Sequence, residues 1–216
     1  MKQGALDLPV ATRFGRGDFL VSDSNRAAFE LVDRWPDWPT RALVLYGPPG
    51  SGKTHLAHMW CERSGAALIR GDDAALKAPE ALRALVAVDN AERASERALF
   101  HLYNLCLERG GSLFLTLPTP PAALDIGLAD LASRLRSLPV VGIAPPDDAL
   151  LTAVLLKQFG DRGIAVAPQI IAFLTARMER SFAAAAALAV RLDRLSLESG
   201  RGGITLKMAR EVLAAG

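Results

Sequence analysis

The sequence predicts an α/β domain built on a five-stranded parallel sheet, followed by a small all-helical domain. Five short runs are almost continuously apolar, as in strands that are covered on both faces: residues 43–46, 67–70, 84–88, 113–117 and 140–143. Helical patterns separate these runs, and no strand pattern follows Pro145 and Pro146. Alternation of strands and helices is typical of a three-layer fold with right-handed crossovers.

Helical periodicity and end signals place the helices between and after these runs. The connecting helices are predicted over residues 24–34, 55–63, 79–82, 96–108 and 128–135. Four more follow residue 146: Asp147 or Asp148 caps the first and Gly160 ends it, Pro168 begins the second, the third spans residues 182–197, and Thr205 caps the last over residues 206–213. The alanine-rich start of the third favours close packing between helices.

The composition is that of a soluble, packed protein. Half of the 216 residues are hydrophobic and 22% are charged, while the net charge of +2 is too small to argue for nucleic-acid binding. Cys61 and Cys106 lie among apolar helical neighbours and are expected to be reduced thiols. Because no apolar run reaches membrane-spanning length and no signal peptide is evident, we expect a cytoplasmic protein without membrane contact.

A complete phosphate-binding loop joins the first strand to the following helix. Its eight residues match the pattern G-x-x-x-x-G-K-[ST]: Gly47, Pro48, Pro49, Gly50, Ser51, Gly52, Lys53 and Thr54. The glycines let successive backbone N–H groups point at phosphate oxygens, and the helix adds its positive end. Lys53 would reach the β- and γ-phosphates, and the Thr54 hydroxyl would hold Mg²⁺. The sequence therefore predicts binding of ADP or ATP with Mg²⁺.

The third apolar run ends in Asp89, which supplies the carboxylate that completes Mg²⁺ coordination in such sites. Many ATPases of this architecture place a second carboxylate at the next position, where this chain has Asn90. A neutral amide cannot act as a general base, so slow intrinsic hydrolysis is expected. In an extended segment Glu92 would share the face of Asn90 and could replace it, an alternative that we favour less.

The fourth strand ends in Thr116, at the edge of the sheet where ligands collect in α/β nucleotide sites. This position would let the hydroxyl touch the γ-phosphate or its attacking water. A threonine that merely ends a strand is an almost equally good interpretation.

Several segments together resemble the AAA+ module of the bacterial replication initiator DnaA, and most closely the Hda family, which regulates DnaA inactivation. They are the Gly-Lys-Thr-His-Leu segment at 52–56, Val-Asp-Asn at 88–90, residues 116–121, and Asp-Leu-Ala-Ser-Arg-Leu at 130–135. The resemblance runs from about Phe14 to the end. DnaA carries a further C-terminal DNA-binding domain, and the layout without it is the one expected of Hda-like proteins.

The resemblance implies roles for residues outside the phosphate-binding loop. Arg134 would be an arginine finger that acts in trans on a neighbouring ATP, in preference to Arg136. Arg180 would be the sensor 2 arginine that links the lid to the phosphates, with Arg177 as the alternative. Thr116 would be sensor 1, and the nucleotide-binding residues would also include His55 and the adenine-walling stretch of Phe19, Leu20, Val21 and Asn25.

The N-terminal residues resemble a peptide that binds the bacterial sliding clamp. Gln3, Leu6 and Leu8 match the pattern Q-x-x-L-x-[LF], in which two leucines enter an apolar groove and the amide fixes the register. The expected division is a flexible tail over residues 1–12, an AAA+ domain over 13–145 and a helical lid over 146–216. The expected partners are the clamp, which is the β subunit of DNA polymerase III, and DnaA, with DNA contacted only through the clamp. A homodimer is possible on this interpretation.

These features predict a nucleotide-bound regulator, with ADP as the expected ligand, that stimulates hydrolysis of DnaA-bound ATP and so limits re-initiation at the replisome. An autonomous AAA+ ATPase of helicase-loader or initiator type is the alternative. The complete phosphate-binding loop supports that alternative, and Asn90 opposes it. A DNA-binding initiator is a third class, which the near-neutral charge disfavours.

Overall fold

The computed structural model describes residues 19–199 and 203–214 and confirms the five-stranded parallel sheet. All pairings are parallel, and the strand order is β2-β3-β4-β1-β5. The strands are β1 Ala42–Tyr46, β2 Ala67–Arg70, β3 Leu85–Asp89, β4 Ser112–Leu117 and β5 Val140–Gly142. Each is within a residue of its predicted bounds at both ends.

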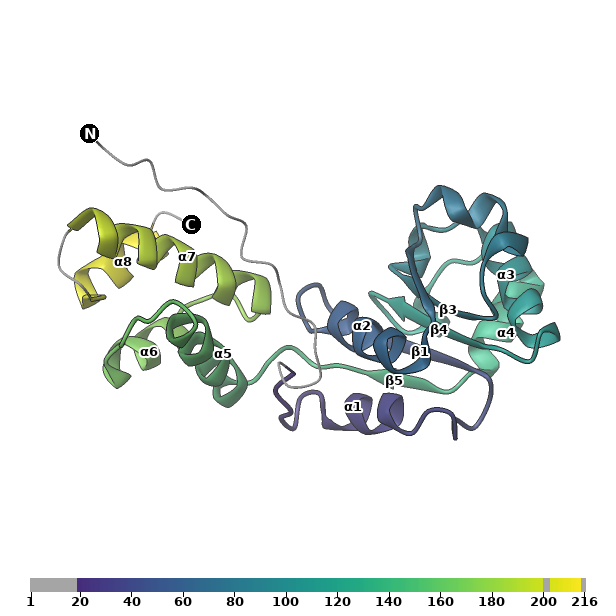
Figure 1. The fold of residues 1–216 in the computed structure, drawn as a ribbon, viewed down its shortest axis with the longest axis horizontal. Coiled ribbons are helices and arrows are strands. Elements are labelled where there is room, and N and C mark those ends of the chain that lie inside the picture. The colour runs from purple at the N-terminus through teal and green to yellow at the C-terminus, as the bar shows by residue number, and fades with distance from the viewer. Residues whose placement is uncertain (1–18, 200–202, 215–216) are drawn as a thin grey trace.

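Helices cover both faces of this sheet to form three layers (Figure 1). The α-helices of the body are α1 Arg26–Asp33, α2 Lys53–Ser64, α3 Glu96–Glu108 and α4 Ala129–Ser137. Short 3₁₀ turns cover Ala74–Lys77, Pro79–Ala81, Ala91–Arg93 and Pro121–Ala123. The chain alternates β-strand and helix from β1 to β5, so each pair of parallel strands is joined by a crossover rather than a hairpin.

The central strand β4 is buried at every residue and divides the core in two. Leu113 and Leu115 face a cluster with α3 and α4, whereas Phe114 faces the opposite cluster with α1 and α2. This is the alternation that a pleated strand imposes. The second cluster is rich in aromatic rings, with Trp60 stacked on Trp38 at 5.4 Å between centroids. Because apolar residues lie on both faces of the sheet, the strands could be recognised in the sequence as continuous apolar runs.

Beyond β5 the only regular elements among the described residues are helices, and these have a core of their own. This lid consists of α5 Asp148–Gly160, α6 Pro168–Thr175, α7 Phe182–Ser199 and α8 Leu206–Ala214, and it lies to one side of the body (Figure 1). Ala185 and Ala189 of α7 are fully buried, as expected where helices approach closely. Met208 N–H donates to the Thr205 hydroxyl at 3.3 Å, which caps α8 as predicted. Among the described residues, no helix is long and apolar enough to span a bilayer.

The structure corrects three of the helix predictions. Helix α1 begins at Arg26 rather than residue 24, because the Asn25 side chain bonds to the chain before the helix. Residues 79–82 form only a 3₁₀ turn. Gly160 is the last residue of α5 and not its terminator. The left-handed residue that turns the chain is Gly163, with φ of 70°, and Ile164 N–H then bonds back to Phe159 O at 2.9 Å.

Asp147 joins the lid to the start of the body. Its carboxylate accepts the Leu150 N–H at 2.7 Å, and this bond is the largest cause of a pKa below the ordinary 3.8. The Ser22 hydroxyl and the Ser24 N–H lower the pKa further. The segment before α1 and the first turn of α5 thus share one carboxylate.

We predict that Asp147→Ala lowers the free energy of unfolding at neutral pH by about 1 kcal/mol, the usual contribution of a helix N-cap. Because the folded-state pKa is lowered, this stabilisation is present above the unfolded-state value and is lost as the pH falls through the folded-state value. Urea unfolding at a series of pH values measures it. Asp125→Ala, at an exposed position, is the control. Equal stability of the Asp147 variant and wild type at pH 7 would contradict the prediction.

Candidate nucleotide-binding site

The phosphate-binding loop connects β1 to α2 and depends on left-handed glycines. Gly50 has φ of 71° and Gly52 has φ of 102°, conformations that other residues rarely adopt. A Cβ on Gly50 would also lie 2.6 Å from the Cβ of Ser181 in the lid. Only glycine at this position allows the loop and the lid to approach this closely. Helix α2 begins at Lys53, so its N-terminal N–H groups face the loop.

Lys53 is 8% exposed and lies folded against the loop. Its ammonium donates to Gly47 O at 2.7 Å and to Pro48 O at 2.9 Å. Burial lowers the pKa of Lys53, and the negative charges of Asp89 and Glu92 oppose that shift. Among the described residues only neutral carbonyl oxygens accept hydrogen bonds from this buried cation, which favours the approach of an anion such as phosphate.

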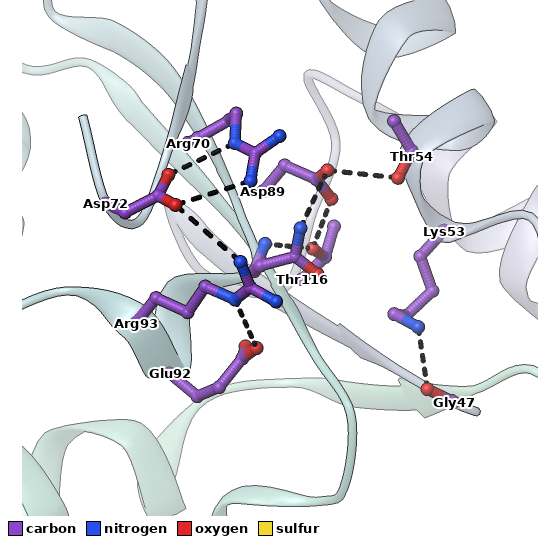
Figure 2. A network of polar contacts seen from close by, with 10 residues as sticks. Gly47, Lys53, Thr54, Arg70, Asp72, Asp89, Glu92, Arg93 and Thr116 are labelled. Carbon is purple, nitrogen blue, oxygen red and sulfur yellow. Dashed lines mark hydrogen bonds and ion pairs between the residues drawn. The ribbon is translucent and has the colours of Figure 1, made fainter. Parts of the chain in front are cut away.

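Asp89 is the centre of a polar network at the carboxyl edge of the sheet (Figure 2). It is 6% exposed. The Thr54 hydroxyl donates to Asp89 Oδ2 at 3.0 Å, and the Thr116 hydroxyl donates to Asp89 Oδ1 at 2.6 Å. Asp89 and Thr54 therefore present two oxygens side by side. That set fits Mg²⁺, which commonly takes one or two protein oxygens and completes its shell with phosphates and water.

The loop also fits phosphate. The Ser51 hydroxyl is buried and has no hydrogen-bond partner among the residues that the structure describes. Gly47 lies so close to Ile143 O that an added Cβ would be 2.6 Å from it. An unsatisfied hydroxyl in a glycine-lined loop that also binds the Lys53 ammonium through its carbonyls is a donor set suited to phosphate oxygens.

Thr116 acts here through Asp89. Its side chain is fully buried, its hydroxyl hydrogen goes to Asp89, and its oxygen accepts the Asn90 N–H at 2.9 Å. The structure thus gives Thr116 the role of orienting the carboxylate. Its contact with a γ-phosphate stays a prediction.

The expectation that Asn90 and Glu92 share one face of an extended segment is wrong. Asn90 has a left-handed backbone with φ of 54°, and a 3₁₀ turn over Ala91–Arg93 follows it. The Asn90 amide donates to Asp89 Oδ2 at 3.3 Å. Strand alternation therefore ends at Asp89, and the turn sets the position of Glu92 independently.

The stretch expected to wall the adenine lies beside the loop. Phe19 stacks on Phe29 at 5.6 Å and meets the His55 ring edge-on at 5.1 Å. Asn25 is 1% exposed and holds this stretch, since its amide donates to Leu20 O and its Oδ1 accepts the Ser22 N–H, both at 2.9 Å. Val21 is left 39% exposed. The sequence had singled out Phe19, Leu20, Val21, Asn25 and His55, and their contact with a nucleotide stays a prediction.

The lid meets the phosphate-binding loop through its backbone, a contact that sequence reasoning missed. Phe182 N–H, at the start of α7, donates to Gly50 O at 3.2 Å. Arg180 is nearby but binds within the lid hinge, donating to Asp148 Oδ1 at 2.5 Å and to Pro146 O at 2.8 Å. Arg177 instead lies over the Phe173 ring at 4.2 Å. Arg180 therefore bonds to the hinge, whereas Arg177 lies over a ring of α6, and the contact of Arg180 with phosphates stays a prediction.

Arg134 lies on α4, at the end of the body away from the lid (Figure 1). Arg134 and Arg136 are both exposed, and neither guanidinium has an ion pair or hydrogen bond among the described residues. Gln3, Leu6 and Leu8 of the expected clamp-binding peptide lie outside the described residues.

Comparisons with known proteins agree with this fold. A family model described as an AAA domain matches residues 43–119. Domain III of the replication initiation protein DnaA from Thermotoga maritima has a TM-score of 0.79 at 17% identity, over 96% of this chain and 98% of that chain. AMPPCP-bound DnaA from Aquifex aeolicus has a TM-score of 0.68 at 20% identity, over 85% and 65% of the two chains.

A motor protein is also similar. The Thermotoga maritima RuvB Holliday junction branch migration motor has a TM-score of 0.75 at 14% identity, over 94% of this chain and 72% of that chain. The chain therefore has the fold of the AAA+ class of nucleotide-binding proteins. Within this class its fold is related to that of domain III of DnaA, which it matches over nearly the full length of both chains.

We predict that Thr116→Val weakens the site by leaving Asp89 Oδ1 and the Asn90 N–H without their partner. The free energy of unfolding should fall by about 1–3 kcal/mol, and ADP binding should lose part of its dependence on Mg²⁺. Urea unfolding and ADP titrations with and without Mg²⁺ measure the two effects. Thr116→Ser keeps the hydroxyl and is the matched control. A valine variant that equals wild type in both assays would refute the orienting role.

Proposed function

We propose that the protein is an Hda-like regulator that stimulates hydrolysis of ATP bound to DnaA. The observation that carries the proposal is Arg134, an exposed arginine with no partner among the described residues on α4 of a DnaA-related fold. A guanidinium supplied in trans can stabilise the charge that develops on a phosphoryl group, and it can raise hydrolysis by about 10³–10⁵-fold. Helix α4 lies at the end of the body away from the lid (Figure 1), whereas the chain's own loop contacts the lid, and this placement favours action on a neighbour.

The chain's own nucleotide would serve as a structural ligand. Two similar structures are of DnaA bound to AMPPCP, an ATP analogue. Here the loop carbonyl of Gly50 is bonded to the lid, so a phosphate that reshapes the loop would also move α7. Bound ADP would then fix the angle between body and lid. Because Asn90 stands in place of a carboxylate, we expect the bound nucleotide to be retained and not rapidly hydrolysed.

We predict that Arg134→Ala abolishes the stimulation of DnaA while the variant still folds and binds ADP. The reason is that the exposed guanidinium has no structural contact to lose within the described part of the chain. Phosphate release from ATP-bound DnaA, in the presence of clamp loaded on DNA, measures the effect. Arg136→Ala removes a neighbouring exposed arginine from the same helix and should stimulate normally. Normal stimulation by the Arg134 variant would disprove the mechanism.

We further predict that clamp binding depends on Gln3, Leu6 and Leu8. Changing all three to Ala should abolish binding to the isolated sliding clamp, because the apolar anchors and the amide are removed together. Thermal unfolding and ADP binding should stay unchanged, which separates this loss from misfolding. Surface plasmon resonance on immobilised clamp measures it. Retained binding would remove the clamp from the proposed function.

The second candidate function is an autonomous ATPase, and the complete Lys53, Thr54 and Asp89 constellation favours it. Steady turnover by the isolated protein distinguishes the two. Hydrolysis at about 1 s⁻¹ or faster would favour the enzyme, whereas copurified ADP with negligible turnover would favour the regulator.

A further inference from the structure

Glu92 is a carboxylate near the nucleotide site that the functions described so far do not use. The residue as a whole is exposed, but its side chain keeps only 25% of its accessible surface. No described residue donates a hydrogen bond to it, and its ion pair with Arg93 is long, at 3.9 Å. The Glu92 oxygens therefore retain their capacity to accept hydrogen bonds from water.

A chain of ion pairs links this side chain to Arg93, Asp72 and Arg70 (Figure 2). Arg93 contacts Glu92 at 3.9 Å and Asp72 at 3.6 Å. Asp72 in turn accepts two hydrogen bonds from Arg70, at 3.1 and 3.3 Å. Single exposed ion pairs contribute little, but linked charges with a two-pronged arginine contact restrict geometry better. Glu92 is thus anchored to the end of β2.

The carboxylate also acts on the phosphate-binding side of the site. The charge of Glu92 is one of the two that oppose the lowering of the Lys53 pKa by burial, the other being that of Asp89. Lys53 is the side chain that reaches the β- and γ-phosphates in loops of this kind. Asn90 turns its amide to Asp89 and offers a donor where a base is needed.

We propose that Glu92 is the general base for slow hydrolysis of the chain's own ATP, and that Arg93 is its positioning residue. The Glu92 carboxylate takes one proton from a water molecule as the water oxygen bonds to the γ-phosphorus. The bond from the γ-phosphorus to the bridging oxygen breaks, and its electron pair stays on ADP. The products are ADP and inorganic phosphate, and Glu92 returns its proton to solvent.

This inference rests on the proposed function and deepens it, because it explains how the chain would reach its ADP-bound form. Slow self-hydrolysis would convert bound ATP once, and the retained ADP would then hold the lid. Glu92 would thus determine whether the chain holds ATP or ADP, and Arg134 would act on the ATP of a neighbouring DnaA.

The test is a single-turnover assay in which excess full-length protein is mixed with Mg²⁺ and γ-labelled ATP. Glu92→Gln should slow phosphate release by about 10²-fold, at the lower end of general-base contributions, with unchanged affinity for ATP. Glu30→Gln, at an exposed position on α1, should react like wild type. Arg93→Gln should slow release several-fold, and Arg93→Lys should restore much of the rate. Wild-type release by the Glu92 variant, weakened ATP binding by it, or no release by wild type would each overturn the proposal.

A second readout separates this proposal from the proposed function. Glu92→Gln loaded with ADP should stimulate DnaA as wild type does, because the loading bypasses self-hydrolysis. If Glu92→Gln hydrolyses its own ATP more slowly than wild type does, and ADP-loaded wild type does not stimulate DnaA, then Glu92 is upheld as the general base and the proposed regulatory function is disproved. Normal self-hydrolysis in Glu92→Gln with normal stimulation would do the reverse.

Discussion

The buried carboxylate of Asp89 is the constraint on which the rest of the site depends. Removing a carboxylate from water is costly unless hydrogen bonds replace the lost hydration, and each bond to a charged group contributes about 1.5–3 kcal/mol. Here Thr54 from α2 and Thr116 from β4 donate from other elements, and the adjacent Asn90 amide is a third donor. Because β4 lies between β1 and β3, both threonine bonds can form only when all three strands are in register. The Asp89 site can therefore form only when β1, β3 and β4 are paired in the sheet.

The lid adds a second constraint, transmitted by backbone atoms. The Gly50 carbonyl holds the first turn of α7, and the closeness of Ser181 leaves no space for a side chain on Gly50. On the other side of the hinge, Asp147 and the Arg180–Asp148 pair tie α5 to the body and to the start of α7. A loop that is shaped by phosphate would be linked mechanically to the lid. This is the property that a nucleotide-dependent regulator requires.

Much of this fold could be predicted because its strands and helices leave patterns in short stretches of the sequence. Strands buried on both faces read as apolar runs, and α3, predicted over residues 96–108, has those bounds in the structure. The errors occur where a side chain or a turn is used in three dimensions. The Asn25 side chain donates a hydrogen bond to Leu20 O, so the helix begins after it. The left-handed turn after α5 is made by Gly163, where Gly160 was expected to end the helix. Neither choice is visible in periodicity.

The sequence by itself determined the phosphate-binding loop, the strand that ends in Asp89 and the helical character of the lid, because each depends on residues adjacent in the chain. The tertiary structure decided how these parts are used. In the folded chain the Thr116 hydroxyl and the Asn90 amide both donate to the Asp89 carboxylate, and Arg180 bonds to Asp148 at the hinge. The tertiary structure also anchored Glu92 through Arg93 to residues of another strand end. Such contacts join residues far apart in the chain, so only folding could specify them.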